Sequence, residues 1–505
     1  MGLPFWNELE ERMGELRDLA EISGLLTWDQ ETYMPPGGGP HRAAQLATLQ
    51  TLLHERLVSP RLGELLARAA DDTSLSDTRR RMVANLSRER DRAVRVPRSL
   101  VQELARRQSL AVEAWRVARE RSDFSLFAPH LEALVQLKRE QADAIGYEGE
   151  RYDALVDGYE PGMRVSRLLP IFAELRDALV PMVQAVTEAP PPPRWRYEEH
   201  RFPVDRQLRF SELLVERMGF DLTKGRLDRS AHPFTCGIGA GDVRLTTRFD
   251  ERNPWVAIFG TIHETGHGLY EQNLPEGHLR DPIGMPASMG LHESQSRLWE
   301  NVVGRSLPFW QGMEKDLREA FPEALEGVSV REVQAAACRV SRSLIRVDAD
   351  ELTYNLHILL RFELELAMIR GELEVGDLPE AWNEKMERFL GIVPSNHAEG
   401  VLQDIHWAWA EFGYFPSYTV GNLYAAVLYE RMRDEIPSMD EALRRGELRA
   451  IRDWLIEKVH RQGHLYEAEE IVERATGKPL ETGALIRYLG DRYGSLYGVS
   501  FGALP

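Results

Sequence analysis

The chain has 505 residues, of which 43% are hydrophobic and 28% charged, a balance typical of a soluble globular protein and not of a disordered or fibrous one. Its formal net charge of −18 argues against a nucleic-acid partner, because phosphate binding requires clustered Lys and Arg in excess. The only two cysteines are Cys236 and Cys338, so any bound metal must be held by His, Asp or Glu.

The sequence gives no sign of membrane insertion or export. Its longest apolar runs fall well short of the roughly 18 residues that a bilayer crossing requires. The first residues, MGLPFWNELEERM, are acidic and amphipathic where a signal peptide has a basic start and an apolar centre. We therefore expect a cytoplasmic protein with no membrane partner.

The first 180 residues predict one helix after another, because apolar residues recur there at intervals of three and four. The predicted helices cover residues 5–26, 42–57, 60–70, 79–94 and 98–120. Four consecutive prolines, Pro190 to Pro193, then predict a loop and a boundary between two helical blocks, since consecutive prolines cannot continue a helix.

Residues 242–249 interrupt the helical pattern. Val243, Leu245 and Thr247 alternate with polar or charged residues, and a period of two predicts a strand. The glycine-rich CGIGAG just before this segment predicts a hairpin. From residue 255 onward the pattern is helical again and includes a long predicted helix from about 329 to 370.

The stretch HETGH suggests a metal site on the helix that follows this hairpin. His263 and His267 are four residues apart, so on a helix their side chains point to the same side and can share one cation. Glu264 is poorly directed to be a third ligand and is suited to act as a general base on water. The alternative is an ordinary amphipathic helix that carries two core histidines.

A third protein ligand must come from another segment. Glu271 lies about 12 Å along the helix from the first histidine, too far to share one ion. Tyr270 and Asn273 occupy the positions where a three-histidine site would need glycine and histidine. The downstream helical segment ASMGLHESQSRLWENVVG offers Glu293 or Glu300, and spacing alone leaves both open.

Six short motifs resemble those of the carboxypeptidase Taq family, and they occur in that family's order. They are HPF at 232, DVRLT at 242, HETGH at 263, HESQS at 292, IRVDAD at 345 and GVLQDIHW at 400. A further N-terminal stretch, LLTWDQETYMPPGG, extends the resemblance over nearly the whole chain. Members of this family are thermostable HExxH metallocarboxypeptidases whose third metal ligand is a glutamate.

The resemblance implies that His263, His267 and Glu293 hold one divalent ion, zinc or else cobalt, and that Glu264 activates water. It implies a mainly α, two-lobed fold with a deep substrate groove and a small sheet beside the metal helix, similar to neurolysin-like and angiotensin-converting-enzyme-like peptidases. It also implies a homodimer. We expect one catalytic domain over 1–505, with a helical lobe to about 190, a metal-binding region over about 200–430 and C-terminal helices over 431–505.

Arg346 is the candidate reader of a substrate's C-terminal carboxylate, because a guanidinium offers two parallel donors to a carboxylate. Taken alone, its sequence context favours an ion pair with Asp350, four residues later on the long predicted helix. The resemblance favours the substrate role instead.

The resemblance also implies substrate contacts in the aromatic segment near the end of the metal-binding region and in the hairpin. An oxyanion needs a positioned donor besides the metal, and His406, Tyr414 and Tyr418 are the candidates in the aromatic segment. We expect His232, Asp242 and Arg244 to shape the groove wall. Asp404 is a candidate either to orient the neighbouring histidine or to cap a helix.

Together these features predict a metal-dependent carboxypeptidase of broad specificity. Its substrates would be peptides with a free C-terminus, from which it would release single amino acids. One alternative is an endo-acting oligopeptidase on the same scaffold, in which Arg346 would be structural. The other is a helical scaffold protein without enzymatic activity.

Overall fold

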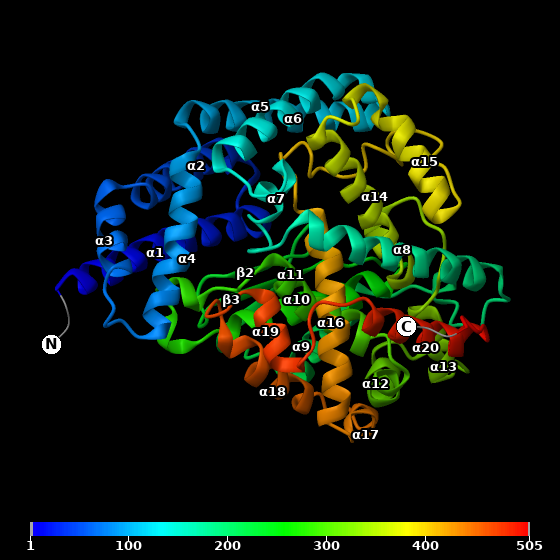
Figure 1. Cartoon of the computed structure of the whole chain (residues 1–505). Helices are drawn as coiled ribbons and strands as arrows, with labels where there is room; N and C mark the ends of the chain where they lie inside the picture. The colour runs from blue at the N-terminus through cyan, green and yellow to red at the C-terminus, as the bar shows by residue number, and fades with distance from the viewer. Residues whose placement is uncertain (1–3, 503–505) are drawn as a thin grey trace.

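The computed structural model describes residues 4–502 and confirms the predicted mainly α fold: within that range, helices surround one small sheet (Figure 1). The N-terminal helices are α1 (Pro4–Thr32), α2 (Gly39–Leu57), α3 (Pro60–Ala70), α4 (Asp77–Arg95), α5 (Arg98–Arg121), α6 (Ala128–Ile145), α7 (Arg151–Val156) and α8 (Val165–Glu188). The proline-rich segment forms a loop between α8 and α9, as its composition predicts.

The middle of the chain contains the sheet and the predicted metal helix. Its elements are α9 (Val204–Met218), β1 (Gly225–Arg229), β2 (Thr235–Gly237), β3 (Val243–Thr247), α10 (Pro254–Gln272), α11 (Met289–Arg297), α12 (Leu307–Ala320), α13 (Val330–Ala337), α14 (Glu351–Arg370) and α15 (Leu378–Leu390). The C-terminal helices are α16 (Phe415–Glu435), α17 (Met439–Arg444), α18 (Arg449–Lys458), α19 (Ala468–Thr476) and α20 (Gly483–Tyr497).

Helix α3 shows how local sequence produces these elements. The Ser59 hydroxyl caps its first turn by accepting the Leu62 N–H at 3.3 Å, and Pro60 occupies the first helical position, where its missing N–H costs nothing. Leu62, Leu65 and Leu66 are buried on one face, as their spacing of three and four predicts.

The described residues form two hydrophobic cores. The division between these cores does not coincide with the loop at Pro190 to Pro193. A small core joins α1, α3 and α4 to Ile283, and these helices lie together at the left of Figure 1. The large core begins at Val96 and continues to Tyr493, so α5, α6 and α8 pack with the metal-binding region. Because apolar side chains from α5, α6 and α8 interdigitate with those of the metal-binding region, the part of the N-terminal block after Val96 has no separate interior.

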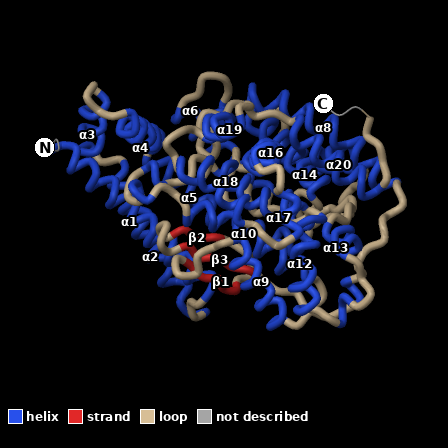
Figure 2. The backbone as a smooth tube through the Cα atoms, turned by 90° about the horizontal axis from the view of Figure 1, so that it is seen from below, coloured by secondary structure: helices blue, strands red, loops and turns tan. Residues whose placement is uncertain are grey.

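The sheet has the strand order β1-β3-β2 and lies beside α10 (Figure 2). Strands β2 and β3 are antiparallel, with Cys236 opposite Arg244, which is the predicted hairpin. Strand β1 pairs with β3 in parallel. It was not predicted, because GRLDR lacks the alternation of apolar and polar residues that marks a half-buried strand.

The long helix predicted from about 329 to 370 is wrong. Helix α13 ends at Ala337, and α14 starts at Glu351 after a segment with one short 3-10 turn, Arg346–Asp348. Asp350 caps α14 by accepting the N–H groups of Leu352 and Thr353, both at 3.1 Å. This cap takes Asp350 out of the helix, so the predicted ion pair between Arg346 and Asp350 does not form within the described residues.

None of the helices within residues 4–502 combines the length and the apolar character needed to cross a bilayer. This agrees with the reading of the apolar runs in the sequence.

A buried carboxylate joins α14 to the N-terminal block. Glu365 is fully buried and accepts hydrogen bonds from the Tyr152 hydroxyl (2.7 Å), the Trp407 indole N–H (2.8 Å) and the Gly413 backbone N–H (3.0 Å). Burial raises the pKa of Glu365 to about 7, although these donors oppose the shift. The proton is therefore held more tightly in the folded protein than in the unfolded chain.

Replacement of Glu365 by Gln should make stability less dependent on pH. A carboxyl whose pKa is raised on folding stabilises the protein at low pH. This contribution is lost as the pH rises from the pKa of the unfolded chain through the folded pKa of about 7. Gln cannot titrate, so the variant lacks this dependence. The free energy of unfolding of Glu365→Gln, relative to wild type, should therefore rise between pH 5 and 8 by up to about 3 kcal/mol. Urea unfolding at several pH values measures this, with the exposed Glu374→Gln as the matched control. If the difference in unfolding free energy between Glu365→Gln and wild type stays constant from pH 5 to 8, the pKa of Glu365 is not raised in the folded protein.

Candidate metal centre and its pocket

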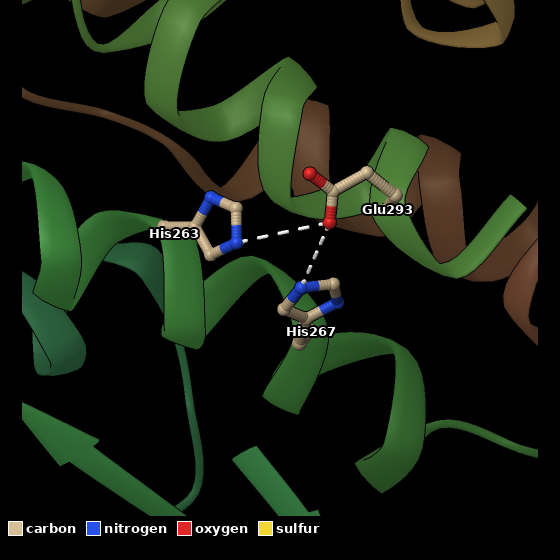
Figure 3. A group of neighbouring side chains, drawn as sticks. All are labelled: His263, His267 and Glu293. Carbon is tan, nitrogen blue, oxygen red and sulfur yellow. Dashed lines mark ion pairs between the residues drawn. The ribbon is translucent and has the colours of Figure 1, made fainter. Parts of the chain in front are cut away.

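Helix α10 presents the two histidines of the HETGH stretch. It starts with Asn253, whose side chain accepts the Trp255 N–H at 3.2 Å, followed by Pro254 in the first turn. Apolar residues on the same helix are buried in the large core. This burial fixes the rotation of α10, so that His263 and His267 point toward α11 (Figure 3).

Helices α10 and α11 approach each other very closely at Gly266. A Cβ atom added there would lie 2.7 Å from the Gln295 carbonyl oxygen and 2.7 Å from the Ser296 Cα, both of them backbone atoms. Only glycine fits at this contact. The close approach brings Glu293 of α11 within reach of the histidines.

Three side chains converge from these helices, and they are the three that the resemblance implies. One ligand atom each of His263, His267 and Glu293 lie within 4.8 Å of one another. The Glu293 Oε2 atom lies 3.8 Å from His263 Nε2 and 3.4 Å from His267 Nε2 (Figure 3). Tetrahedral zinc with bonds of about 2.1 Å separates its ligands by about 3.4 Å. The donor set and its spacing therefore fit one small divalent ion.

The electrostatics of His267 and Glu293 favour their ligand forms, whereas Glu293 and Glu300 raise the pKa of His263 against the effect of its burial and favour its protonated form. Burial lowers the pKa of His267 to about 3, which keeps its imidazole neutral. The pKa of Glu293 falls well below its ordinary value even though burial opposes ionisation, because Arg297 and both histidines stabilise the carboxylate. A neutral imidazole and an ionised carboxylate are the forms that bind metal.

A second layer of charge holds this cluster in place. Glu300 accepts a hydrogen bond at 2.8 Å from Nδ1 of His263, which directs the opposite ring nitrogen, Nε2, to the cluster. Arg297 pairs with Glu293 at 2.7 Å and with Glu300 at 3.3 Å, and Arg305 pairs with Glu300 at 3.2 Å. Of the two glutamates that spacing left open, Glu293 faces both histidines and Glu300 lies behind the first.

Glu264 lies beside the cluster and is oriented by the sheet. It is 6% exposed, and its Oε2 accepts the Thr235 hydroxyl at 2.7 Å. Burial raises its pKa, an effect that His263 and Thr235 oppose. A carboxylate with a raised pKa beside a group of candidate metal ligands is suited to accept and return a proton.

A pocket of about 890 Å³ opens over these residues, within the usual size range of ligand sites. Its lining includes both histidines, Glu264 and Glu293, with further residues from the hairpin, the first turns of α10, the 3-10 turn before α14, and α16. A row of tyrosines faces the cluster from the opposite segments: Tyr354, Tyr414 and Tyr418.

Arg346 lines this pocket, and Asp404 and Tyr354 hold its guanidinium in place. Its Nε and Nη2 atoms each lie 2.9 Å from Asp404 Oδ1, and its Nη1 donates to the Tyr354 hydroxyl at 3.2 Å. A guanidinium has five N–H donors, so one donor remains on each Nη. Asp404 also pairs with the fully buried Arg361 at 2.6 Å, and neither caps a helix nor hydrogen-bonds to His406.

The aromatic segment supplies the remaining pocket donors. Tyr414 and Tyr418 line the pocket, and His406 lies behind them, 8% exposed, with Nε2 3.1 Å from the Tyr418 hydroxyl. Burial and, to a smaller extent, the nearby Arg346 lower the pKa of His406 to about 3. A neutral His406 can accept the Tyr418 proton or donate to its oxygen, so it orients that hydroxyl.

The other hairpin candidates lie outside the pocket lining. His232 is exposed next to Pro233, which does line the pocket. Arg244 pairs with Asp242 at 2.8 Å and stacks over the Trp28 ring of α1 at 4.1 Å. The structure therefore brings Asp242 and Arg244 to the contact between the sheet and α1, and their role in substrate binding stays a prediction.

Sequence reasoning missed several residues of the site. Thr235 carries no sequence signal of its own, because its partner Glu264 lies 29 residues away. Tyr354 and Arg305 lie eight and five residues from Arg346 and Glu300, spacings outside the three or four residues that mark a helical pair. Arg297 could have been found, since it follows Glu293 by four residues on one helix.

The family model described as "Carboxypeptidase Taq (M32) metallopeptidase" matches residues 8–493. "Thermostable carboxypeptidase 1" of Thermus thermophilus is 43% identical, over 98% of this chain and 99% of the relative. "Carboxypeptidase 1" of Bacillus subtilis is 40% identical, over 97% of this chain and 98% of the relative.

Two solved carboxypeptidase structures also match nearly the whole chain. An M32 carboxypeptidase from Deinococcus radiodurans aligns with a TM-score of 0.96 and 40% identity, over 98% of this chain and 100% of that chain. A carboxypeptidase from Pyrococcus furiosus aligns with a TM-score of 0.95 and 36% identity, over 98% and 99%. The likeness covers the complete fold and not only the metal helix.

Replacement of Asp404 by Asn should strongly destabilise the protein. The change leaves two buried guanidinium groups, Arg346 and Arg361, without their carboxylate, and breaking a buried pair in this way costs about 3–5 kcal/mol. Urea unfolding measures the loss, and Asp348→Asn, an exposed change beside Arg346, is the control. Equal stability of both variants would show that Asp404 does not neutralise these arginines.

Proposed function

The chain belongs to the carboxypeptidase Taq family of M32 metallopeptidases and is a metal-dependent carboxypeptidase, and we propose that His263, His267 and Glu293 hold its single metal ion. The observation that carries this proposal is the convergence of two imidazole nitrogens and one carboxylate oxygen within 4.8 Å. The names of the relatives favour neither an endo-acting oligopeptidase nor a scaffold without activity.

Glu264 is the proposed general base. When bound, a divalent ion polarises the scissile carbonyl and acidifies water in the site. Glu264 takes a proton from the attacking water and returns it to the leaving amine, with Thr235 holding its carboxylate in place. If Nε2–H of His406 donates to the Tyr418 oxygen, the Tyr418 O–H stays free, and it and the Tyr414 hydroxyl donate toward the oxyanion that forms at the carbonyl.

Arg346 is the proposed reader of the substrate's C-terminal carboxylate. Asp404 and Tyr354 fix the guanidinium from behind, which leaves one donor on each Nη for a two-pronged contact. Arg346 lines the same pocket as His263, His267 and Glu293, which supports binding of the last residue between Arg346 and the metal and release of one amino acid at a time. His232, Asp242 and Arg244 lie outside this lining and are the proposed residues of the groove wall.

We also propose zinc as the ion, with cobalt as the alternative, because two imidazoles and one carboxylate form a common zinc set. Two unpaired cysteines, Cys236 and Cys338, suit a reducing cytoplasm. The homodimer and thermostability are inferred from the family and from the names of relatives such as "Thermostable carboxypeptidase 1" of Thermus thermophilus. Light scattering and thermal unfolding test these two points.

The Glu264→Gln variant should keep its metal and lose turnover. Gln preserves the shape of the side chain but cannot accept a proton, so the rate should fall roughly 10²- to 10⁴-fold. Peptide hydrolysis and elemental analysis measure the two properties, with Glu276→Gln, at an 84% exposed side chain, as the control. Substantial residual activity would reject Glu264 as the base, and loss of metal would reassign it to metal binding.

A peptide supplied as free acid and as C-terminal amide should separate exo from endo cleavage. Wild type should cleave the acid roughly 10- to 100-fold faster, since the contact of Arg346 with a charged group contributes about 1.5–3 kcal/mol. Mass spectrometry of the products at short times measures both rates. Arg346→Gln should abolish the difference, and the exposed Arg339→Gln should not. Equal cleavage of acid and amide by wild type would establish an endopeptidase.

A further inference from the structure

The pocket extends well beyond the metal cluster, along the first turns of α10. Its lining includes Asn253, the cap of α10, and Arg248 at the end of the strand before it. Thr247, the residue before Arg248, places its hydroxyl 3.2 Å from that of Thr261, which precedes His263 by two residues on α10. Arg248 therefore lies beside α10, within about two helical turns, roughly 10 Å, of His263.

Arg248 differs from the other arginines that line the pocket. Arg297 pairs with Glu293, Arg305 with Glu300, and Arg346 with Asp404. The Arg248 side chain is exposed and makes no hydrogen bond, ion pair or ring contact with any residue in 4–502. It is a free positive charge on the wall of the substrate pocket, in a chain whose net charge is −18.

The acidic residues close to Arg248 are already engaged. Glu251 pairs with Arg201 at 2.5 Å, and Asp250 Oδ1 accepts the Arg252 backbone N–H at 2.8 Å. The Arg252 side chain is itself exposed and adds positive charge at this end. With the negative charge of Asp250 counted, Arg248 and Arg252 leave one net positive charge here, which favours an anion that comes from outside the chain.

The distance from the metal cluster identifies which part of a peptide reaches Arg248. The released residue spans only about 3.3–3.6 Å, and Arg346 holds its carboxylate. Asp348, the other exposed and unpaired charge of the lining, follows Arg346 by two residues and so belongs to that end. A distance of roughly 10 Å corresponds to about three residues of extended chain, and only one residue follows the scissile bond, so Arg248 faces residues upstream of it.

We propose that Arg248 is a specificity-determining residue that binds an acidic side chain of the substrate, one to three residues before the scissile bond. This inference rests on the proposed carboxypeptidase function and on Arg346 as the carboxylate reader. The contact is exposed, so it supplies a preference and not a requirement. Exposed ion pairs change an equilibrium by roughly two- to fivefold, and salt screens them.

The test uses peptides that differ at one position. Each has the same C-terminal residue and carries Glu, Gln or Lys at the first, second or third position before the scissile bond. Release of the last amino acid gives kcat/KM for wild type, Arg248→Gln, Arg248→Glu and a control, Arg196→Gln, whose side chain is 73% exposed outside the pocket.

Wild type and the control should prefer Glu over Gln roughly two- to fivefold at one of these positions at low ionic strength, and the preference should fall toward one in about 0.5 M salt. Arg248→Gln should lose the preference, and Arg248→Glu should prefer Lys. Equal kcat/KM for Glu and Gln peptides with wild type would overturn the inference, as would a preference that survives in both Arg248 variants.

The wild-type comparison stands alone if a variant fails to fold. Wild-type protein that hydrolyses no peptide would contradict the proposed function and remove this inference with it. Wild-type protein that releases amino acids from every peptide at the same kcat/KM would contradict this inference alone.

Discussion

The structure depends on one buried contact, in which the Glu293 carboxylate lies between two histidines at 3.4 and 3.8 Å. The histidines come from α10 and the carboxylate from α11, so the spacing is set by how closely two helices pack. Gly266 allows that approach, because any side chain there would collide with the α11 backbone. A methyl group at this position would push Glu293 away from the histidines and separate the ligand set.

The burial of charged side chains is the second constraint on the molecule. Two neighbouring groups of ion pairs satisfy it. Around the cluster, Glu293 and Glu300 are neutralised by Arg297 and Arg305. Next to it, Asp404 pairs with both Arg346 and Arg361. Unpaired charges in such positions would each cost several kcal/mol. These ion pairs also fix the positions of Arg346 and Glu293. The two remaining donors of Arg346 and the Oε2 atom of Glu293 are therefore ordered before any ligand binds.

Local pattern predicted most of the fold and half of the site. Helices of period three to four, the β2–β3 hairpin and the His263, Glu264 and His267 arrangement all depend on residues close together in sequence. The failures come from contacts across the chain. Strand β1 forms through its pairing with β3, and the break before α14 depends on the capping role of Asp350. Thr235 and Asp404 were invisible or misread because their partners lie 29 and 58 residues away.

X-ray absorption at the metal edge of the purified protein tests the central claim most directly. The account predicts one ion per chain, with scattering from two imidazole nitrogens at about 2.0–2.1 Å and from carboxylate or water oxygens at a similar distance. The imidazole signal should disappear in the His263→Ala, His267→Ala double variant. A bound ion whose spectrum lacks imidazole scattering, or an unchanged spectrum in the double variant, would contradict the assignment of His263, His267 and Glu293 as the metal centre.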